Sequence, residues 1–419
     1  MSAPKPERIG ALDFVRGVAV LGILAINVTG FWGPLLATFS PALPRLESGP
    51  DLGGALWFAA AYVLFEGKMR GLFTLLFGAS MMLFADAAER RGANADLMQV
   101  RRLLLLMLFG YAHYALLWWG DILFPYAVCG MLAFALRRLA PEPLAAAALL
   151  LFLASHGLEM IGDLAAIATE SRVLAGHGTP AEAAEQTAMM GRIAASIAAD
   201  SRVLHAPFLE AVRIRLTTAP LLPLETLGAT FFETFPLMLL GMALLRMGLF
   251  TGEWEPATLR RIAWIGIAAG GAMSAALIGW AALHRFPPGA MFAVMGSLAA
   301  IPHLAMTLGY LAALLLLWPR LQGSPLGTHL AAAGRCAFTN YLGTTVVMIA
   351  LFAGWGLSLG GVLPRAALPL VVLGGWALML AWPRWWLARF GQGPLEALWR
   401  RLTWLGVPRL PPPLADGAV

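Results

Sequence analysis

The sequence predicts an all-α, polytopic helical membrane protein with about ten transmembrane helices and a helical insert on the outer side. Of its 419 residues, 59% are hydrophobic and 12% are charged, about half the charged fraction of a soluble domain. Apolar runs of about 20 residues recur along the chain, and each can cross a hydrocarbon core about 30 Å thick. The run from Leu103 to Trp119 is apolar all round, unlike the alternating strands of a membrane β-barrel. Soluble globular and disordered proteins are therefore excluded.

Ten apolar segments define the expected spans. They are residues 11–31, 70–88, 103–119, 122–138, 143–161, 226–246, 260–282, 290–317, 334–353 and 366–382. A further stretch, Gly53–Phe65, is polar at both ends and fits an interfacial helix or a short re-entrant helix. No convincing sequence repeat relates the two halves, so an inverted-repeat transporter is not indicated.

The basic residues indicate how these spans are oriented. Two are lysines and 27 are arginines, and most lie at the ends of apolar runs, where positive charge is retained on the cytoplasmic side. With the N-terminus inside, the inner loops hold most of the basic residues and the short outer loops hold few. This predicts a protein of the bacterial inner membrane with both termini in the cytoplasm. The net charge of +6 is thereby explained without a nucleic-acid partner.

One long hydrophilic segment divides the chain. The expected organisation is a five-helix half over 1–162, a periplasmic helical insert over 163–225, a second five-helix half over 226–382 and a cytoplasmic amphipathic tail over 383–419. Within the insert, Thr179 to Glu182 has the form of a capping box, which predicts a helix running to about Asp200. We expect the insert to pack over the outer mouth of the bundle, because long unstructured loops are uncommon.

The first expected span carries three polar residues on one stripe. Arg16 and Asn27 are eleven residues apart, which is about three helical turns and roughly 16 Å along the axis, and Asp13 lies one turn before Arg16. A charge within a span is unfavourable unless it is paired or faces water, so we expect Arg16 to face the interior of the bundle. The alternative is an Asp13–Arg16 pair that only anchors the end of the helix.

A second candidate site lies at the end of the third expected span. His113 precedes a tight turn that contains Trp119, Gly120 and Asp121, and the turn lets the carboxylate fold back towards the imidazole. Such a pair can deprotonate a hydroxyl or an amine. The alternative is that Asp121 caps the next helix while His113 forms a hydrogen bond across the bundle.

Further ionisable residues occur at membrane depth. Glu66 and Arg70 are four residues apart and fit an ion pair on one helix. Lys68, which we place on the outer side together with the imidazole, fits a ligand for an acceptor substrate. Glu233 and His303 fall within the sixth and eighth spans, where an ionisable side chain indicates function by default.

The ninth expected span contains a last polar group. Arg335 and Thr339 are expected on one helix face, with Asn340 and Tyr341 beside them. Arg335 fits a ligand for an anionic group such as a phosphate, and hydrogen bonding between helices is the alternative for all four. The two cysteines lie in separate apolar segments without metal-ligand spacing, so no metal is expected.

Five motifs, in their order and spacing, resemble the YeiB-like family of bacterial inner-membrane proteins. They are Leu12-Asp13 through Arg16-Gly17 to Asn27, Glu66 to Phe73, His113 through Trp119 to Leu123, Gly334-Arg335 through Asn340 to Leu342, and Gly393 to Glu396 through Trp399-Arg400. The resemblance covers nearly the whole chain, and it implies a domain of unknown function in the C-terminal half.

The first half is also similar to the transmembrane acyltransferase superfamily, which includes heparan-glucosaminide acetyltransferase. This resemblance implies transfer of an acyl group from cytoplasmic acyl-CoA or acetyl-CoA, as co-substrate, to an acceptor hydroxyl or amine on the far side. The superfamily pattern of Arg, ten residues and His is met by Arg16, but Asn27 occupies the His position. An amide cannot act as a general base. Either His113 has taken that role or the scaffold is used for something else.

Three hypotheses follow. In the first, a membrane acyltransferase uses His113 and Asp121 as its catalytic pair, Asn27 as an oxyanion or acceptor ligand, and Arg16 and Arg335 as donor ligands. It predicts a tunnel between the two ends of the bundle. The expected substrate-binding residues are Lys68, Glu66, Arg70, Trp119, Asn340, Glu233 and His303.

The second hypothesis is a transporter or flippase for a lipid-linked or amphipathic solute, which uses the same polar residues in a midplane site. The third is a noncatalytic scaffold whose outer segment binds a partner. Membrane lipid and a small-molecule or glycan acceptor are the expected partners, and a homo-oligomer stays open.

Overall fold

The computed structural model describes residues 6–43 and 51–407, and every regular element in these ranges is helical. The helices are α1 (Pro6–Trp32), α2 (Leu52–Leu64), α3 (Lys68–Glu89), α4 (Ala95–Leu116), α5 (Leu123–Ala135), α6 (Pro141–Leu174), α7 (Pro180–His205), α8 (Phe208–Thr218), α9 (Leu222–Arg246), α10 (Pro256–Leu283), α11 (Pro288–Met295), α12 (Ala300–Leu321), α13 (Pro325–Arg335), α14 (Ala337–Phe352), α15 (Leu368–Phe390) and α16 (Pro394–Thr403). Short 3-10 turns, η1 (Leu35–Thr38), η2 (Ser297–Ala299) and η3 (Arg365–Ala367), lie between them. The expected all-α class is confirmed.

Seven described helical segments are long and apolar enough to cross a membrane. They are Gly10–Trp32, Leu52–Glu89, Pro141–Leu174, Leu222–Arg246, Pro256–Leu283, Pro288–Leu321 and Arg365–Phe390. The bent pair of α13 and α14 raises the number to eight, and α4 and α5 fill the two remaining expected positions. Each expected span overlaps a helix or a helix pair. The chain is therefore a multi-pass helical membrane protein.

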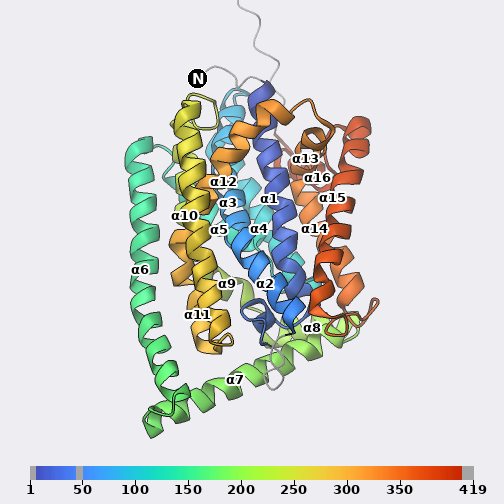
Figure 1. Ribbon diagram of the computed structural model, residues 1–419. Helices are drawn as coiled ribbons and strands as arrows, with labels where there is room; N and C mark the ends of the chain where they lie inside the picture. The colour runs from blue at the N-terminus through green and yellow to red at the C-terminus, as the bar shows by residue number, and fades with distance from the viewer. Residues whose placement is uncertain (1–5, 44–50, 408–419) are drawn as a thin grey trace, which may run out of the picture.

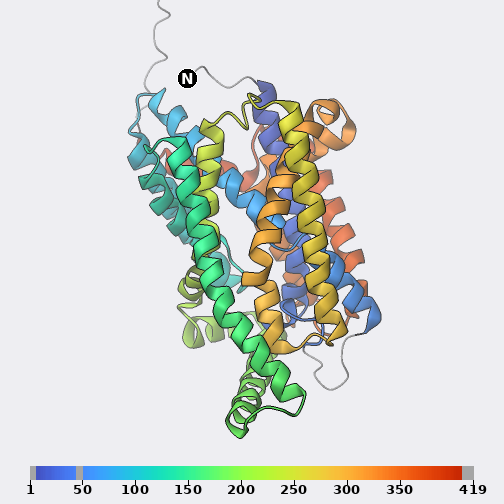
Figure 2. The same cartoon turned by 60° about the vertical axis from the view of Figure 1, so that its left-hand side comes forward.

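Helix α1 stands near the middle of the bundle (Figure 1). It packs against α3, α13, α14 and α15, and its Phe14, Val15, Ala19 and Val28 side chains are buried. Helix α6 lies at the edge of the bundle, and Figure 2 shows it reaching along nearly the whole height of the molecule. Helix α6 is mostly uncovered by protein, whereas α1 is mostly buried.

Polar side chains fix where several helices begin. Asp51, Asn94 and Ser324 each accept a hydrogen bond of 2.7–3.0 Å from the backbone N–H three residues later, at the starts of α2, α4 and α13. At α7, Thr179 Oγ1 accepts from the N–H of Glu182 at 3.2 Å, and Glu182 Oε2 accepts from the N–H of Thr179 at 2.8 Å. The predicted capping box is confirmed.

The insert between α6 and α9 closes one end of the bundle. Helix α7 lies across the end opposite the N-terminus (Figure 1), and we call these two ends the α7 end and the N-terminal end. Asp200 Oδ2 accepts a hydrogen bond of 3.0 Å from the N–H of Leu35, and Leu204 O accepts one of 2.8 Å from the N–H of Gly354. These bonds fasten α7 to the chain segments that follow α1 and α14.

Two helices run past their expected span ends. Helix α6 continues to Leu174 and α15 to Phe390, although the expected spans end at 161 and 382. Gly176 (φ 76°) and Gly391 (φ 74°) adopt the left-handed conformation just after these helices, which is how many helices terminate. Backbone geometry, and not the fall in hydropathy, sets both ends.

The ninth expected span is a bent pair of helices and not one helix. Helix α13 ends at Arg335, α14 begins at Ala337, and their axes differ by 84°. Glu396 of α16 accepts hydrogen bonds from the backbone N–H and the hydroxyl of Thr339, at 3.0 and 2.5 Å, and so supports the start of α14 from a distant part of the chain. The expectation that Arg335 and Thr339 share one helix face is wrong.

The close approach of α1 and α13 can be tested by substitution at Gly334. A Cβ atom on Gly334 would overlap the carbonyl oxygen of Asp13, so we expect Gly334→Ala to lower the free energy of unfolding by about 1–3 kcal/mol. Gly343→Ala is the control, because a Cβ there meets open space and alanine favours a helix. SDS-induced unfolding of the purified variants measures both. Equal stability of the two variants would contradict the close approach.

The buried carboxyl group of Asp200 should make the stability of the protein depend on pH. Burial raises the pKa of its carboxyl above the usual 3.8, opposed in part by the hydrogen bond from the N–H of Leu35. A raised folded-state pKa contributes stability that is present at acid pH and lost as the pH rises through it. Asp200→Asn keeps the acceptor and removes the charge, so its melting temperature should exceed that of the wild type at neutral pH and match it below about pH 4.

Asp200→Ala is the control for this test. It removes both the charge and the acceptor, so the N–H of Leu35 loses its partner and the unfolding free energy should lie about 1 kcal/mol below that of Asp200→Asn at every pH. A stability gain for Asp200→Asn that is the same at acid and neutral pH would show that ionisation is not the cause.

Candidate functional site

A cavity of about 200 Å³ lies inside the bundle beside α1. Residues of α1, α3, α4, α5 and α14 form most of its wall, and residues of α13 and α16 complete it at the N-terminal end. Its apolar lining is Val20, Ile23, Phe73, Phe77, Leu106, Ile122, Leu123, Ala337, Phe338 and Trp399, and its polar lining is Arg16, Ser80, Arg102, Tyr126, Arg335, Tyr341 and Glu396.

The charged residues gather at the N-terminal end of this cavity. Along α1, Arg16 precedes Val20 and Ile23, and along α4, Arg102 precedes Leu106. Both helices run from the N-terminal end towards the α7 end, so the guanidinium groups lie nearer the first and the apolar side chains lie deeper. The cavity therefore suits an amphipathic ligand with an anionic head.

Arg102 is a site residue that the sequence does not single out, because arginines near helix ends are explained by topology alone. Its guanidinium lies between the rings of Phe84 and Trp399, 4.7 and 4.5 Å from their centroids. Its buried Nη1 has no hydrogen-bond partner among the described residues. Buried donors without a partner are rare, so this one is free for an anionic ligand.

The other ionic groups at this end have partners. Arg16 donates to Asp13 Oδ1 at 2.7 Å and also lines the cavity, so the pair forms and the guanidinium faces the interior of the bundle as expected. Arg335 donates to a backbone carbonyl that follows α15, at 2.8 Å. Counting Arg102, three guanidinium groups and the single carboxylate of Glu396 line the cavity, and positive charge prevails there.

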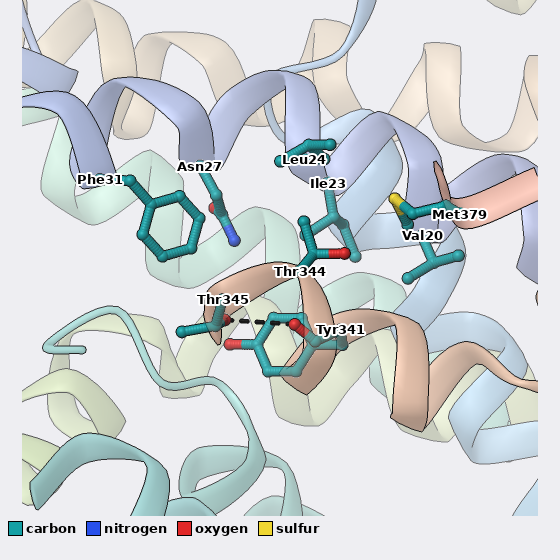
Figure 3. A pocket seen from close by; sticks show the side chains of 9 residues that line it. All are labelled: Val20, Ile23, Leu24, Asn27, Phe31, Tyr341, Thr344, Thr345 and Met379. Atoms are coloured by element: carbon teal, nitrogen blue, oxygen red, sulfur yellow. Dashed lines mark hydrogen bonds between the residues drawn. The ribbon is translucent and has the colours of Figure 1, made fainter. Parts of the chain in front are cut away.

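A smaller cavity continues from the deep end of the first. It measures about 10 Å³, room for about one water molecule, and it shares Val20, Ile23 and Tyr341 with the larger cavity. Figure 3 shows the amide of Asn27 on α1 turned towards the space beside Thr345 on α14. Within the described ranges this amide makes no hydrogen bond. Its donor is available inside the small cavity.

His113 lies behind Thr345 and lines neither cavity. Its Nδ1 is 2.9 Å from Asp121 Oδ1, and its Nε2 is 3.1 Å from Thr345 Oγ1. Asp121 Oδ2 also accepts from the N–H of Phe124 at 2.8 Å. The expected imidazole–carboxylate pair forms, and so do the helix cap and the bond across the bundle that were its alternative. Thr345 was not predicted, because hydroxyls are common between membrane helices.

Two expected substrate ligands take part in contacts between helices. A Cβ atom on Gly30 of α1 would lie only 2.8 Å from the Trp119 ring, so this ring packs closely against α1. Asn340 donates to carbonyl oxygens of α13 and α15 at 3.2 and 3.3 Å, and it accepts from Trp382 Nε1 at 2.9 Å. The amide of Asn340 is fully used, which favours its structural interpretation.

A second polar cluster lies where α2 gives way to α3. Arg70 donates to both carboxylate oxygens of Glu233 on α9, at 3.1 and 2.8 Å, and its Nη1 is 3.6 Å from Glu66 Oε1. The expected Glu66–Arg70 pair is thus present, with Glu233 as the stronger partner. One guanidinium holds two carboxylates within the bundle.

Lys68 lies apart from His113. Its side chain is fully buried and donates to Tyr62 O at 2.7 Å. His303 packs on the Tyr62 ring, and its buried Nε2 has no partner in the described part of the chain. Gly67 (φ 70°) starts α3, and the neighbours of Lys68 come from α2 and α12. Lys68 and His113 share no hydrogen-bond partner in the described part of the chain, and the placement of Lys68 on the outer side together with His113 stays a prediction.

The fold and the site define a class of protein. It is a multi-pass helical membrane protein with an internal cavity that is cationic at one end and apolar within. Beyond its deep end stand a hydroxyl, an imidazole and a carboxylate in hydrogen-bonded order.

Comparisons identify the family. Residues 244–406 match the family model DUF418, described as a protein of unknown function. The chain is 30% identical over 402 residues to the uncharacterized protein YeiB of Escherichia coli (strain K12), covering 95% of this chain and 96% of YeiB. It is 29% identical over 418 residues to YxaH of Bacillus subtilis (strain 168), covering 95% of each. The chain belongs to the YeiB-like family. No solved structure matches it.

The Arg70 cluster predicts unequal effects of removing its members. Arg70→Met leaves the carboxylates of Glu66 and Glu233 without a counter-charge, so the unfolding free energy should fall by about 2 kcal/mol or more. Glu233→Gln leaves Arg70 paired with Glu66 and should lower it by about 1 kcal/mol. SDS-induced unfolding of both variants measures the difference. A larger effect of Glu233→Gln would contradict the shared pairing.

Proposed function

We propose that this chain is an integral membrane acyltransferase, which moves an acyl group from acyl-CoA or acetyl-CoA to a hydroxyl or amine acceptor across the membrane. The observation that carries the proposal is a row of neighbouring features: the cationic end of the larger cavity, the smaller cavity that shares three lining residues with it, and then Thr345, His113 and Asp121. An acyltransferase needs a tunnel between donor and acceptor, and this row supports one along the same course.

The N-terminal end of the cavity suits the donor. The phosphates of coenzyme A are anionic, and the guanidinium groups of Arg16, Arg102 and Arg335 match phosphate oxygens in charge and geometry. The cavity, about 200 Å³, is smaller than the roughly 300–1,000 Å³ of pockets that enclose a whole drug-sized ligand. The nucleotide would stay at the mouth while the thioester arm enters the apolar interior.

The far end of the row suits the reaction. His113 can take a proton at Nε2, because Asp121 at Nδ1 favours the tautomer with a free lone pair there. The amide of Asn27 can donate to an oxyanion that forms in the smaller cavity. Donating a hydrogen bond to an oxyanion requires no basic group. Asn27 can therefore serve this role although the superfamily pattern has a His at its position.

We place the chain in the bacterial inner membrane with both termini in the cytoplasm. Loops and helix ends at the N-terminal end hold Arg90, Arg91, Arg137, Arg138 and Arg246, and short positive loops are retained inside. The donor would then enter from the cytoplasm, and α7 would face the acceptor, a small molecule or a glycan. Membrane lipid surrounds the bundle.

One observation favours a second candidate, a transporter or flippase for a lipid-linked or amphipathic solute. The cluster of Glu66, Lys68, Arg70, Glu233 and His303 lies at membrane depth, where ionisable residues mark pathways for solutes and protons. A transporter would open this region alternately to the two sides. The acyltransferase needs only a fixed passage.

Donor binding tests the proposal. Acetyl-CoA and free CoA should raise the melting temperature of the purified protein in detergent, and Arg102→Ala should weaken binding about 10- to 100-fold, because a charge-assisted hydrogen bond contributes about 1.5–3 kcal/mol. Thermal-shift titrations measure the affinities. Arg16→Ala should act in the same direction.

Arg320→Ala is the matched control. Arg320 lies at the end of α12, exposed and away from the cavity, so its removal should leave the shift unchanged. An equal loss with Arg320→Ala would indicate nonspecific charge binding. No shift with either ligand at millimolar concentration would contradict the donor assignment and favour transport.

A further inference from the structure

Thr345 stands between His113 and the cavities. The hydroxyl-bearing side chain lines the smaller cavity, whereas the imidazole lines neither cavity and its side chain has no exposed surface. Oγ1 of Thr345 is 3.1 Å from Nε2 of His113. A ligand in the smaller cavity therefore contacts Thr345 and not His113, and the Thr345 hydroxyl is the group that connects this side chain to the imidazole.

The three groups lie in the order used by hydroxyl nucleophiles. A carboxylate bonded to Nδ1 fixes the tautomer, and Nε2 then accepts the proton of the hydroxyl. Thr345 Oγ1 also lies 3.2 Å from the carbonyl oxygen of Tyr341. The hydroxyl proton can therefore turn towards either acceptor, and turning it to Nε2 makes the oxygen nucleophilic.

We propose that Thr345 is the nucleophile of the site and carries the acyl group as an ester between donor and acceptor. The inference rests on the proposed acyl transfer and extends it from direct transfer to a two-step reaction. It names Thr345 and His113 as catalytic residues and Asp121 as a positioning residue.

The two steps balance in atoms and charge. First, Thr345 Oγ1 attacks the thioester carbonyl, its proton passes to His113 Nε2, the C–S bond breaks, and the thiolate takes the proton and leaves as a free thiol. Second, an acceptor hydroxyl or amine attacks the Thr345 ester, His113 takes its proton, and the C–Oγ1 bond breaks. The proton returns to Oγ1, and the threonine is restored. No oxidant or metal is needed.

The surroundings accept both the charge and the acyl group. The unpaired amide of Asn27 faces the same small cavity, where it can donate to the oxyanion of each tetrahedral intermediate. The small cavity holds about one water molecule, so the acyl group must extend past Val20 and Ile23 into the larger cavity. Its apolar wall suits a hydrocarbon chain.

The neighbouring Thr344 provides a matched contrast. It also lines the smaller cavity, and its hydroxyl donates to the carbonyl oxygen of Asn340 one turn earlier, at 2.5 Å. No bond joins it to His113 among the described residues. If Thr344 and Thr345 only donate hydrogen bonds to backbone carbonyls of α14, substituting either one should have the same effect on acylation.

Acylation by a small activated ester tests the inference without coenzyme A. The purified full-length protein in detergent is mixed with p-nitrophenyl acetate, and we expect a burst of p-nitrophenol and one acetyl group on the peptide that contains Thr345, detected by mass spectrometry after an acid quench. Thr345→Ser should keep the burst, and Thr345→Val should abolish it. His113→Ala and Asp121→Asn should slow the burst at least about 100-fold, because they remove general-base catalysis.

Thr344→Val is the control and should keep both the burst and the label on Thr345. The wild-type label does not depend on the folding of any variant. Acetylation on another residue, or a burst that survives Thr345→Val, would overturn the inference. So would an unlabelled Thr345 in a protein that releases p-nitrophenol.

The same measurements with acetyl-CoA as the acyl donor distinguish failure of this inference from failure of the proposed function. Thermal shift and thiol release with acetyl-CoA, together with turnover that persists in Thr345→Val, would support acyl transfer and exclude the ester on Thr345. An acetyl label on Thr345 from the activated ester, without any response to acetyl-CoA, would keep the nucleophile and remove the proposed donor.

Discussion

The bundle depends on one constraint, that polar groups in hydrocarbon must find their partners within the protein. Arg16 with Asp13, Arg70 with Glu233, and His113 with Asp121 all obey it. Against this background, unpaired polar atoms are informative. Within the described ranges they include those of Arg102, at the charged end of the larger cavity, and of Asn27, beside the smaller one; the other buried ones belong to Trp57, Gln99, His303 and Arg365, which line neither cavity. The first two lie at the places where a ligand would supply the missing partner.

Much of the fold follows from local sequence, and less of the site does. Hydropathy locates the ten helical segments, and the short turn after α4 made the contact between His113 and Asp121 one of two interpretations, which the structure contains. Arg102 was missed because the rings around it come partly from Trp399, 297 residues later in the sequence. The bend at Cys336 was missed for a similar reason, because its support, Glu396, is supplied by α16. Contacts between distant segments leave no periodic signal.

The arginines of the larger cavity and the His113–Asp121 pair lie at separate places in the bundle, and this separation has a chemical advantage for the proposed reaction. Under the proposed function, the anionic donor would be recognised at the N-terminal end of the larger cavity, where three guanidinium groups lie. The His113 couple lies beyond an apolar passage, shielded from solvent. Low dielectric strengthens each hydrogen bond within that couple, and the absence of bulk water would protect the proposed ester on Thr345 from hydrolysis. A single cavity with both functions at one place would have neither advantage.

Helix α16 forms part of the wall of the larger cavity and is synthesised after all the other helices. Trp399 donates to the carbonyl oxygen of Arg102 at 2.9 Å and covers its guanidinium, while Glu396 supports the start of α14. The N-terminal half therefore enters the membrane before its own cavity has a complete wall. Until the ribosome has released α16, Arg102 has the Phe84 ring but lacks the Trp399 ring. A chain cut short by an early stop codon or by proteolysis before α16 would insert as a bundle without a closed site.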